Sequence, residues 1–292
     1  MDNKENINKK SFGLVDYGEL TDRDFHRLSA FVYKGFGIKL PEQKKILVKS
    51  RLIKRLKELN FNKYSEYIDF VLQNNEESEA EIINMIDVIS TNKTDFFRES
   101  AHYEFLSDSV IPEFVAASKR HVKVWSAGCS TGEEVYTIAM VLEEERLKNN
   151  ILDYQVYGSD ISVSALKKAV QATYPYAKVE GIPPHYRKRY LLKSKNDTSP
   201  KIRVIKELRQ KTRFLRINLV DDFYPVSKDF DVIFCRNTLI YFDVETQKKV
   251  VNNLIRHLNT NGYLFIGHSE SLINYNIKEL QHVKPTVYKK IS

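Results

Sequence analysis

The sequence feature that most constrains the fold of this chain is a strand-to-helix turn made of small residues. In the stretch VWSAGCSTGEEVYTIAMVL (residues 124–142), two glycines, a cysteine and a serine–threonine pair separate an apolar run from an amphipathic one. Small residues let the backbone turn sharply and come close to a ligand. They stand where a strand at 122–126 would end and a helix at 133–146 would begin. In an open α/β sheet this junction lies at the carboxyl edge, where ligands bind, so the stretch predicts a small-molecule site.

After an expected helix at 102–117, apolar and amphipathic segments alternate to the end of the chain. Short helices fit between most of the apolar segments, and this alternation predicts an α/β fold with a doubly wound parallel sheet. Residues 186–211 break the pattern, because the turn signal SKNDTSP separates two short alternating runs. They predict a small β-hairpin subdomain inserted into the sheet domain. The expected strands of the main sheet are HVKVWSA (121–127), YQVYGSD (154–160), TRFLRINL (212–219), FDVIFCRN (230–237) and GYLFIGH (262–268).

The first third of the chain has a different pattern. Residues 1–19 predict a flexible polar tail, and residues 20–90 predict an all-helical domain. Pro41 suits the first turn of a helix that continues to residue 59. One stripe of this helix is basic and consists of Lys44, Arg51 and Arg55. A roughly opposite stripe is apolar, is expected to face a core, and consists of Ile46, Ile53 and Leu56.

Composition disfavours several classes of protein. The apolar fraction of 42% is sufficient for a core, and no run of about 18 apolar residues could form a transmembrane helix. The opening MDNKENINKK lacks the apolar segment of a secretory signal. Cys129 and Cys235 belong to no CxxC or Cys/His cluster. We therefore expect no metal site and a reduced, cytoplasmic location.

The positive charge of the chain is concentrated in one segment. The formal net charge is +8, yet residues 186–216 alone hold 12 Lys and Arg against two acids. Such a patch suits a polyanion, an acidic protein or an anionic membrane surface. A solvated face without a partner is the alternative, and the pattern does not decide between them.

The glycine turn differs from both common nucleotide-binding signatures. No lysine follows Gly132, as a P-loop requires, and Gly128 and Gly132 are not arranged as GxGxxG. Glu133 and Glu134 open the helix where a pyrophosphate would lie, so they repel a dinucleotide and favour a cationic amino or sulfonium group. Asp160 ends the second expected strand, where an acid can hold a ribose diol. Together these features favour S-adenosylmethionine over NAD.

Five motifs in order resemble the family of chemotaxis receptor methyltransferases, CheR. They are STNKTDFFRE (90–99), WSAGCSTGEEVYTIAM (125–140), GSDIS (158–162), FDVIFCRNTLIYFD (230–243) and GYLFIGHSESL (262–272). The resemblance implies a class I methyltransferase domain at 102–292 with its β-subdomain at about 186–211, a helical domain at 20–90, and a linker at 91–101 that lines the cofactor cleft. It also implies methyl transfer from S-adenosylmethionine, leaving S-adenosylhomocysteine, to glutamate side chains of chemoreceptors.

The same resemblance assigns roles to particular residues. Arg98 and Tyr241 are the expected catalytic residues, with Tyr241 facing the transferred methyl group. The basic stripe of Lys44, Arg51 and Arg55 is expected to dock the acidic receptor substrate. Glu133 is expected at the methionine amino end and Asp160 at the ribose. The residues expected to bind the cofactor are Asn92, Thr94, Arg98, Glu133, Asp160, Asn218, Leu219, Arg236 and Asn237.

Two other functions remain open. A nucleic-acid methyltransferase would explain the basic segment, although CRNTLIYF stands where many enzymes that methylate base amines carry [DNS]PP[YFW]. The second alternative is a non-enzymatic regulator that binds the cofactor but does not transfer the methyl group. Tyr241 could also be a core aromatic and Arg98 an interdomain ion pair. His268, Ser269 and Glu270 are adjacent at a strand end and cannot form a catalytic relay.

The resemblance also implies the partners. We expect the cytoplasmic helical domain of chemoreceptors as substrate, a monomeric enzyme, no nucleic acid and no stable membrane insertion. Some relatives capture a receptor C-terminal peptide on the inserted hairpin, and these share a glycine-rich turn there. This chain has KSKNDTSPK (193–201) instead, so we expect no dependence on such a peptide and a general electrostatic role for the basic hairpin.

Overall fold

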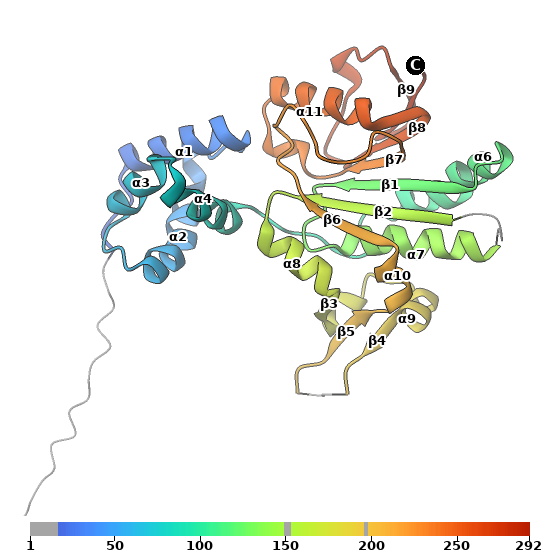
Figure 1. Cartoon of the computed structure of the whole chain (residues 1–292), viewed down its shortest axis with the longest axis horizontal. Coiled ribbons are helices and arrows are strands. Elements are labelled where there is room, and N and C mark those ends of the chain that lie inside the picture. The colour runs from blue at the N-terminus through green and yellow to red at the C-terminus, as the bar shows by residue number, and fades with distance from the viewer. Residues whose placement is uncertain (1–16, 149–152, 196–197) are drawn as a thin grey trace, which may run out of the picture.

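The computed structural model describes residues 17–148, 153–195 and 198–292. Residues 1–16, which make up most of the predicted tail, lie outside the described residues. The described chain forms a group of helices and an α/β part, joined by the segment that follows α4 (Glu76–Ile89) (Figure 1).

Four helices and a short 3-10 turn make up the N-terminal part. The Thr21 hydroxyl accepts the Asp24 N–H and caps the start of α1. The Asn75 side chain accepts the Ser78 N–H and caps the start of α4. The buried faces of the helices share one apolar core. The elements are α1 (Asp22–Phe36), η1 (Glu42–Lys44), α2 (Lys45–Leu59), α3 (Tyr64–Leu72) and α4 (Glu76–Ile89).

The apolar stripe predicted for α2 is partly wrong. Ile46 is 81% exposed, while Val48, Leu52 and Leu56 form the buried face. The sequence pattern was ambiguous because apolar residues occur on more than one side of this helix. Ile53 is half-buried beside the core, so the true face is rotated from the predicted one.

The end of α1 packs directly on the α/β part. Gly37 closes the helix with φ 68°, a conformation that favours glycine. A Cβ atom there would lie 2.6 Å from the Val220 side chain and 3.1 Å from that of Phe242. This close approach explains the glycine and places the helices against the carboxyl edge of the sheet.

The main sheet has seven strands in the order β6-β2-β1-β7-β8-β10-β9. The first five are parallel, and β10 runs antiparallel to both β8 and β9. The chain moves outward from β1 through β2 to β6 and then returns to β7 on the other side of β1. The gap between β1 and β7 is therefore a topological switch point, where ligands bind in such sheets. The strands are β1 (His121–Ala127), β2 (Asp153–Asp160), β6 (Thr212–Arg216), β7 (Phe230–Cys235), β8 (Leu258–Ile266), β9 (Leu280–Lys284) and β10 (Val287–Lys290).

Alternate residues of the central strands enter two separate cores. Val124 of β1 packs in a cluster with residues of α7 (Glu133–Lys148), and its neighbour Trp125 packs in a cluster with residues of α11 (Val244–His257). Helices thus cover both faces, which confirms the predicted doubly wound α/β fold. The other helical elements are α5 (Ala101–Phe105), a π turn η2 (Leu106–Val110), α6 (Ile111–Ala116), α8 (Val163–Gln171), η4 (Leu239–Tyr241) and η5 (Ile273–Tyr275).

The inserted subdomain is larger than the predicted hairpin. β4 (Leu191–Lys193) and β5 (Lys201–Val204) form the expected antiparallel pair, but β3 (Thr173–Pro175) adds a third strand in the order β3-β5-β4. At three residues, β3 is too short to show an alternating pattern in the sequence. Three short helical elements accompany the sheet, namely η3 (Tyr176–Val179), α9 (Pro184–Tyr190) and α10 (Lys206–Gln210).

Across the three described stretches, no helix has the length and apolar character that crossing a membrane requires.

Candidate active site

A pocket of about 230 Å³ lies where the linker, the helical part and the carboxyl ends of the strands meet. Its walls include turns that follow β1, β2, β6 and β7, as expected for a switch-point site. The structure brings most of the predicted residues together here. Those that line the pocket are Lys44, Asn92, Thr94, Arg98, Asp160, Asn218, Leu219, Arg236, Asn237 and Tyr241.

The glycine turn after β1 is explained by close contacts. Gly128 has φ 89°, and a Cβ atom there would lie 2.3 Å from the Thr238 hydroxyl oxygen, on the chain that follows β7. Gly132 has φ 94°, and its Cβ atom would lie 2.8 Å from that of Ala169 on α8. Neither position admits a larger residue without displacement. The turn therefore lets three chain segments converge on one side of the pocket.

Asp160 is a buried acceptor at the end of β2. Its Oδ2 accepts the Ser130 N–H at 2.7 Å, and its Oδ1 accepts the Ser162 N–H at 2.9 Å. Burial raises the pKa of Asp160, and these backbone donors oppose the rise. Each oxygen keeps a second lone pair, and the residue borders the pocket. The carboxylate is therefore held rigidly and can accept hydroxyl groups from a ligand.

The structure corrects the assignment of Glu133. This side chain is 2% exposed, accepts a hydrogen bond from Thr131 and lies 3.4 Å from Lys178, and it is not among the residues that line the pocket. Glu134, one position along α7, lines the pocket instead. One residue turns an α-helix by about 100°. The sequence places both acids in the first turn, but only the phase of the helix decides which one faces the pocket.

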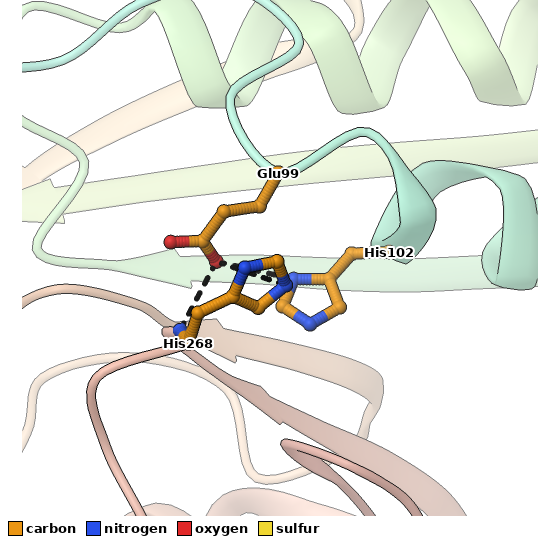
Figure 2. Close-up of side chains that lie close together, drawn as sticks. All are labelled: Glu99, His102 and His268. Carbon is orange, nitrogen blue, oxygen red and sulfur yellow. Dashed lines mark hydrogen bonds and ion pairs between the residues drawn. The ribbon is translucent and has the colours of Figure 1, made fainter.

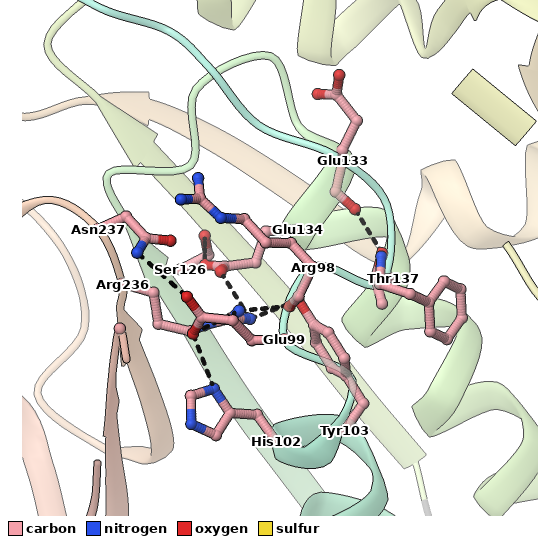
Figure 3. A network of polar contacts seen from close by, with 12 residues as sticks. Arg98, Glu99, His102, Tyr103, Ser126, Glu133, Glu134, Thr137, Arg236 and Asn237 are labelled. Carbon is pink, nitrogen blue, oxygen red and sulfur yellow. Dashed lines mark hydrogen bonds and ion pairs between the residues drawn. The ribbon is translucent and has the colours of Figure 1, made fainter. Parts of the chain in front are cut away.

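Glu134 belongs to a buried polar network around Arg236 (Figure 3). Ser126 donates its hydroxyl to Glu134 at 2.7 Å, and Arg236 lies 3.3 Å from Glu134 and 3.1 Å from Glu99. Arg236 also donates to the Tyr103 hydroxyl at 2.7 Å. Burial raises the pKa of Glu134, against the effect of Arg236. Burial alone would lower the pKa of Arg236, but Tyr103, Glu134 and Glu99 raise it overall.

Three of these network residues were missed by the sequence-based assignment. Glu99 directly follows Arg98 in the FFRE motif, and Tyr103 lies in the next helix, α5, four residues further along the chain. Glu134 stands beside an assigned residue. The sequence did contain a signal for these residues, because their acidic and hydroxyl side chains can pair with the arginine of the CRN motif. Their distance in sequence from Arg236 concealed that pairing.

The linker is fastened along one wall of the pocket. The Asn92 carbonyl oxygen accepts the Ser130 hydroxyl at 3.0 Å, and the Phe97 N–H donates to Thr137 of α7 at 3.1 Å. Lys178 donates to the Thr94 carbonyl oxygen. Arg98 lines the pocket, and its guanidinium donates to the Lys93 carbonyl oxygen at 3.2 Å, within the linker itself. The side chain of Arg98 is thus directed by its own segment.

The opposite wall comes from the ends of β6 and β7. Asn218 donates its amide to the Gly35 carbonyl oxygen of α1 at 3.0 Å and to Asp221 at 2.9 Å. Glu270, which the sequence analysis excluded from a catalytic relay, accepts the N–H groups of Asn237 at 3.0 Å and Ile240 at 3.2 Å. It thereby fixes the turn between Arg236 and Tyr241 rather than reaching a reacting group.

Tyr241 and Lys44 lie together on the side of the pocket nearest the helices. The Lys44 Nζ is 5.5 Å from the centre of the Tyr241 ring, a cation–π distance. Lys39 also donates its backbone N–H to the Tyr241 carbonyl oxygen at 3.2 Å. The helical part therefore contributes directly to the wall that holds the expected catalytic tyrosine.

Arg51 and Arg55 do not reach the pocket. Arg51 donates to the carbonyl oxygens of Ile89 and Ser90 at the end of α4. Arg55 pairs with the buried Glu81, and its side chain is only 12% exposed. Both guanidiniums serve the packing of α2 on α4. Of the predicted docking stripe, Lys44 alone lines the pocket.

Several cations of the basic segment are likewise engaged within the protein. Arg187 donates to the carbonyl oxygens of Ile182 and Glu180, Arg189 pairs with Glu144, and Lys211 pairs with Asp153. The segment therefore carries less unpaired positive charge than its composition indicates.

A rigid acid after β2, a glycine turn after β1 and a second buried acid at the start of α7 fit a cofactor with a ribose and a cationic chain. This pocket at the switch point of a doubly wound sheet defines an S-adenosylmethionine-dependent methyltransferase. Residues 92–289 match the family description "CheR methyltransferase, SAM binding domain", and residues 23–90 match "CheR methyltransferase, all-alpha domain". The chain belongs to the CheR methyltransferase family, which confirms the resemblance seen in its motifs.

Named relatives align over nearly the whole chain. The chemotaxis protein methyltransferase of Borreliella burgdorferi is 38% identical over 290 residues, covering 98% of this chain and 99% of that protein. Chemotaxis protein methyltransferase 2 of Pseudomonas aeruginosa is 35% identical over 268 residues, covering 92% and 93%. The chemotaxis protein methyltransferase of Salmonella typhimurium is 34% identical over 271 residues, covering 92% and 90%.

Proposed function

We propose that this protein transfers a methyl group from S-adenosylmethionine to glutamate side chains of chemoreceptors. The observation that carries the proposal is the pocket in which Asp160 and Glu134, both held by hydrogen bonds, face the FFRE linker and Tyr241. Membership of the CheR family and the names of the relatives support receptor glutamates as the acceptors.

We assign the cofactor contacts as follows. Asp160 accepts the ribose hydroxyls, and Glu134 takes the role at the methionine amino end that the sequence assigned to Glu133. Both carboxylates lose solvation on burial, so a cationic or hydroxyl partner offsets that cost. The remaining walls are formed by residues that line the pocket beside them, namely Asn92, Thr94, Arg98, Asn218, Leu219, Arg236 and Asn237.

The reaction needs little acid–base equipment. A glutamate side chain has an ordinary pKa of about 4.3 and is ionised near neutral pH, so no general base is required. The bound cofactor supplies a methyl group on a sulfonium sulfur. The acceptor oxygen forms a bond to the methyl carbon as the sulfur–methyl bond breaks, and opposite charges disappear in that step. A poorly hydrated pocket therefore favours it.

The residues of the chain provide alignment for this step. We assign Tyr241 to orient the acceptor carboxylate through its hydroxyl, and Arg98 to pin a carboxylate at the pocket. Lys44, beside Tyr241, attracts the acidic surface around the target glutamates. Arg51 and Arg55 act indirectly, since their contacts to α4 position α2, which begins directly after Lys44.

We further propose a monomeric cytoplasmic enzyme that does not act on nucleic acid. The pairing of Arg187, Arg189 and Lys211 within the protein reduces the cationic surface available to a polyanion. The remaining positive charge of the insertion makes general contact with the acidic receptor bundle, without need of a receptor C-terminal peptide.

The test is a methyl-transfer assay with labelled S-adenosylmethionine and three acceptors: a receptor cytoplasmic fragment, duplex DNA and RNA. We expect label only in the receptor fragment, and its loss when the target glutamates are replaced by alanine. Label in DNA or RNA would support the rival enzyme. Cofactor binding without transfer to any acceptor would support a non-enzymatic regulator.

A further inference from the structure

Two histidines and a glutamate from distant parts of the chain converge beside the cofactor pocket (Figure 2). Glu99 Oε2 lies 3.6 Å from His102 Nδ1 and 3.9 Å from His268 Nε2. One potential ligand atom from each of the three residues lies within 4.8 Å of the others. None of the three was assigned a ligand role from the sequence, because Glu99 and His102 are far from His268 along the chain.

The protonation of His102 follows from its neighbours. The Thr286 hydroxyl donates to the Pro285 carbonyl oxygen, so it must accept from His102 Nε2, which is 2.7 Å away. A neutral imidazole that carries its proton on Nε2 has a bare lone pair on Nδ1.

This arrangement leaves a buried acceptor facing another acceptor. His102 is 3% exposed, and its Nδ1 has no hydrogen-bond partner among the described residues. The nearest polar atom of Glu99 is a carboxylate oxygen, which cannot donate when ionised. An unpartnered buried nitrogen is costly. Glu99 Oε2 already accepts from Arg236 at 3.1 Å and from the His268 backbone N–H at 3.3 Å. The unmet acceptor is therefore His102 Nδ1, and a cation bound between it and the carboxylate would give it a partner.

We propose that Glu99, His102 and His268 form a binding site for a divalent transition-metal ion of the Zn²⁺ type. Two imidazoles and one carboxylate are a common zinc ligand set, with a water in the fourth position. The Nε2–H of His102 donating to Thr286 is the outer contact that fixes the orientation of such a ligand.

The three ligand atoms, which lie within 4.8 Å of one another, must move closer together to hold a zinc ion. Zinc bonds of about 2.0–2.1 Å in a tetrahedron place ligand atoms about 3.3 Å apart, and the two glutamate–histidine distances are 3.6 and 3.9 Å. His268 is the residue able to close the gap, because its side chain is 55% exposed on the turn after β8. The exposed side of the cluster also gives the ion and its water a path from solvent.

The positive charge of Arg236 does not outweigh the acids around it. Arg236 lies 3.1 Å from Glu99 and 3.3 Å from Glu134, so one guanidinium is shared by two carboxylates. Arg236, Glu99 and Glu134 together carry a net charge of −1. A cation at Glu99 is therefore electrostatically compatible with Arg236 in place.

The test uses the full chain without a histidine tag, titrated calorimetrically with Zn²⁺ alone. We expect one saturable site per chain, and a visible Co²⁺ spectrum of low coordination number. His268→Ala should weaken Zn²⁺ binding at least about tenfold, the lower bound for loss of even an outer contact. Glu99→Gln should weaken it similarly while preserving side-chain size.

The matched control is His282→Ala, which removes an exposed histidine from β9 in the same C-terminal region. We expect unchanged Zn²⁺ affinity in this variant, and a Zn²⁺-dependent rise in Tm in wild type and His282→Ala but not in His268→Ala. The proposal is overturned if wild type shows no saturable site, if His268→Ala binds as wild type does, or if both histidine variants lose affinity equally.

Discussion

Asp160→Asn separates the cofactor role of this residue from its structural one. The two carboxylate oxygens each accept a backbone N–H, from Ser130 at 2.7 Å and from Ser162 at 2.9 Å. Asparagine has almost the same shape but only one acceptor oxygen. Its amide nitrogen must face one of these N–H donors, so one hydrogen bond is lost and a buried donor is left without a partner.

The magnitude follows from these contacts. A buried unsatisfied donor lowers the free energy of unfolding by about 1–3 kcal/mol, which for a domain of this size lowers Tm by about 2–12 °C. A hydrogen bond to a charged acceptor contributes about 1.5–3 kcal/mol. Loss of the ribose contact should therefore weaken cofactor binding about 10- to 150-fold.

Calorimetry with S-adenosylmethionine and S-adenosylhomocysteine measures this effect. Both ligands carry the ribose, so we expect the same fold loss for each. The matched control is Asp231→Asn, since Asp231 is a buried acid on β7 that accepts the Lys123 N–H at 2.9 Å but does not line the pocket. Its Tm should fall while cofactor affinity stays unchanged. Unchanged affinity in folded Asp160→Asn, or an equal loss in Asp231→Asn, would refute the assignment.

Three further predictions concern the pocket. Tyr241→Phe removes one hydroxyl and should lower kcat about tenfold with little change in cofactor affinity. Steady-state kinetics and calorimetry measure the two quantities. Equal losses of kcat and of cofactor affinity would make Tyr241 a packing residue. Burial raises the pKa of Glu134, so this carboxylate protonates at a higher pH than an ordinary glutamate. The affinity of the wild-type enzyme for S-adenosylmethionine should be full above that pKa and should fall as the pH drops through it. The Glu134→Gln variant should bind the cofactor more weakly and with less dependence on pH. An identical pH profile in the variant would contradict the assignment. Lys44→Glu should raise the KM for a receptor fragment about 2- to 10-fold, most strongly at low salt, with unchanged cofactor affinity. Lys54→Glu, on the exposed side of α2 and 72% exposed, is the control and should behave as wild type.

The sequence was most informative where a motif and a strand end coincide. Asp160 and Arg236 each follow a run of buried strand residues, and the ends of neighbouring parallel strands meet at one edge of the sheet. Their convergence on one pocket was therefore predictable. Gly128 was also correctly predicted to allow a close approach of the backbone, because only a very small residue tolerates the contact with Thr238.

The sequence was least informative where long-range pairing or helix phase decides the outcome. Glu133 and Glu134 are chemically identical neighbours, and only the rotation of α7 turns Glu134 toward Ser126 and Arg236. Arg55 looks exposed on a basic stripe, yet Glu81 of α4 buries it. No local pattern predicts a partner that lies on another helix.

The linkage formed by the enzyme is the most direct test of the central claim. A glutamyl methyl ester releases methanol in mild base, whereas methyl groups on nitrogen or carbon do not. Receptor fragment labelled by this enzyme from S-adenosylmethionine should release its label as volatile methanol, and peptide mass spectrometry should place the methyl groups on glutamate. Label that resists base, or that maps to other side chains, would contradict glutamate methylation.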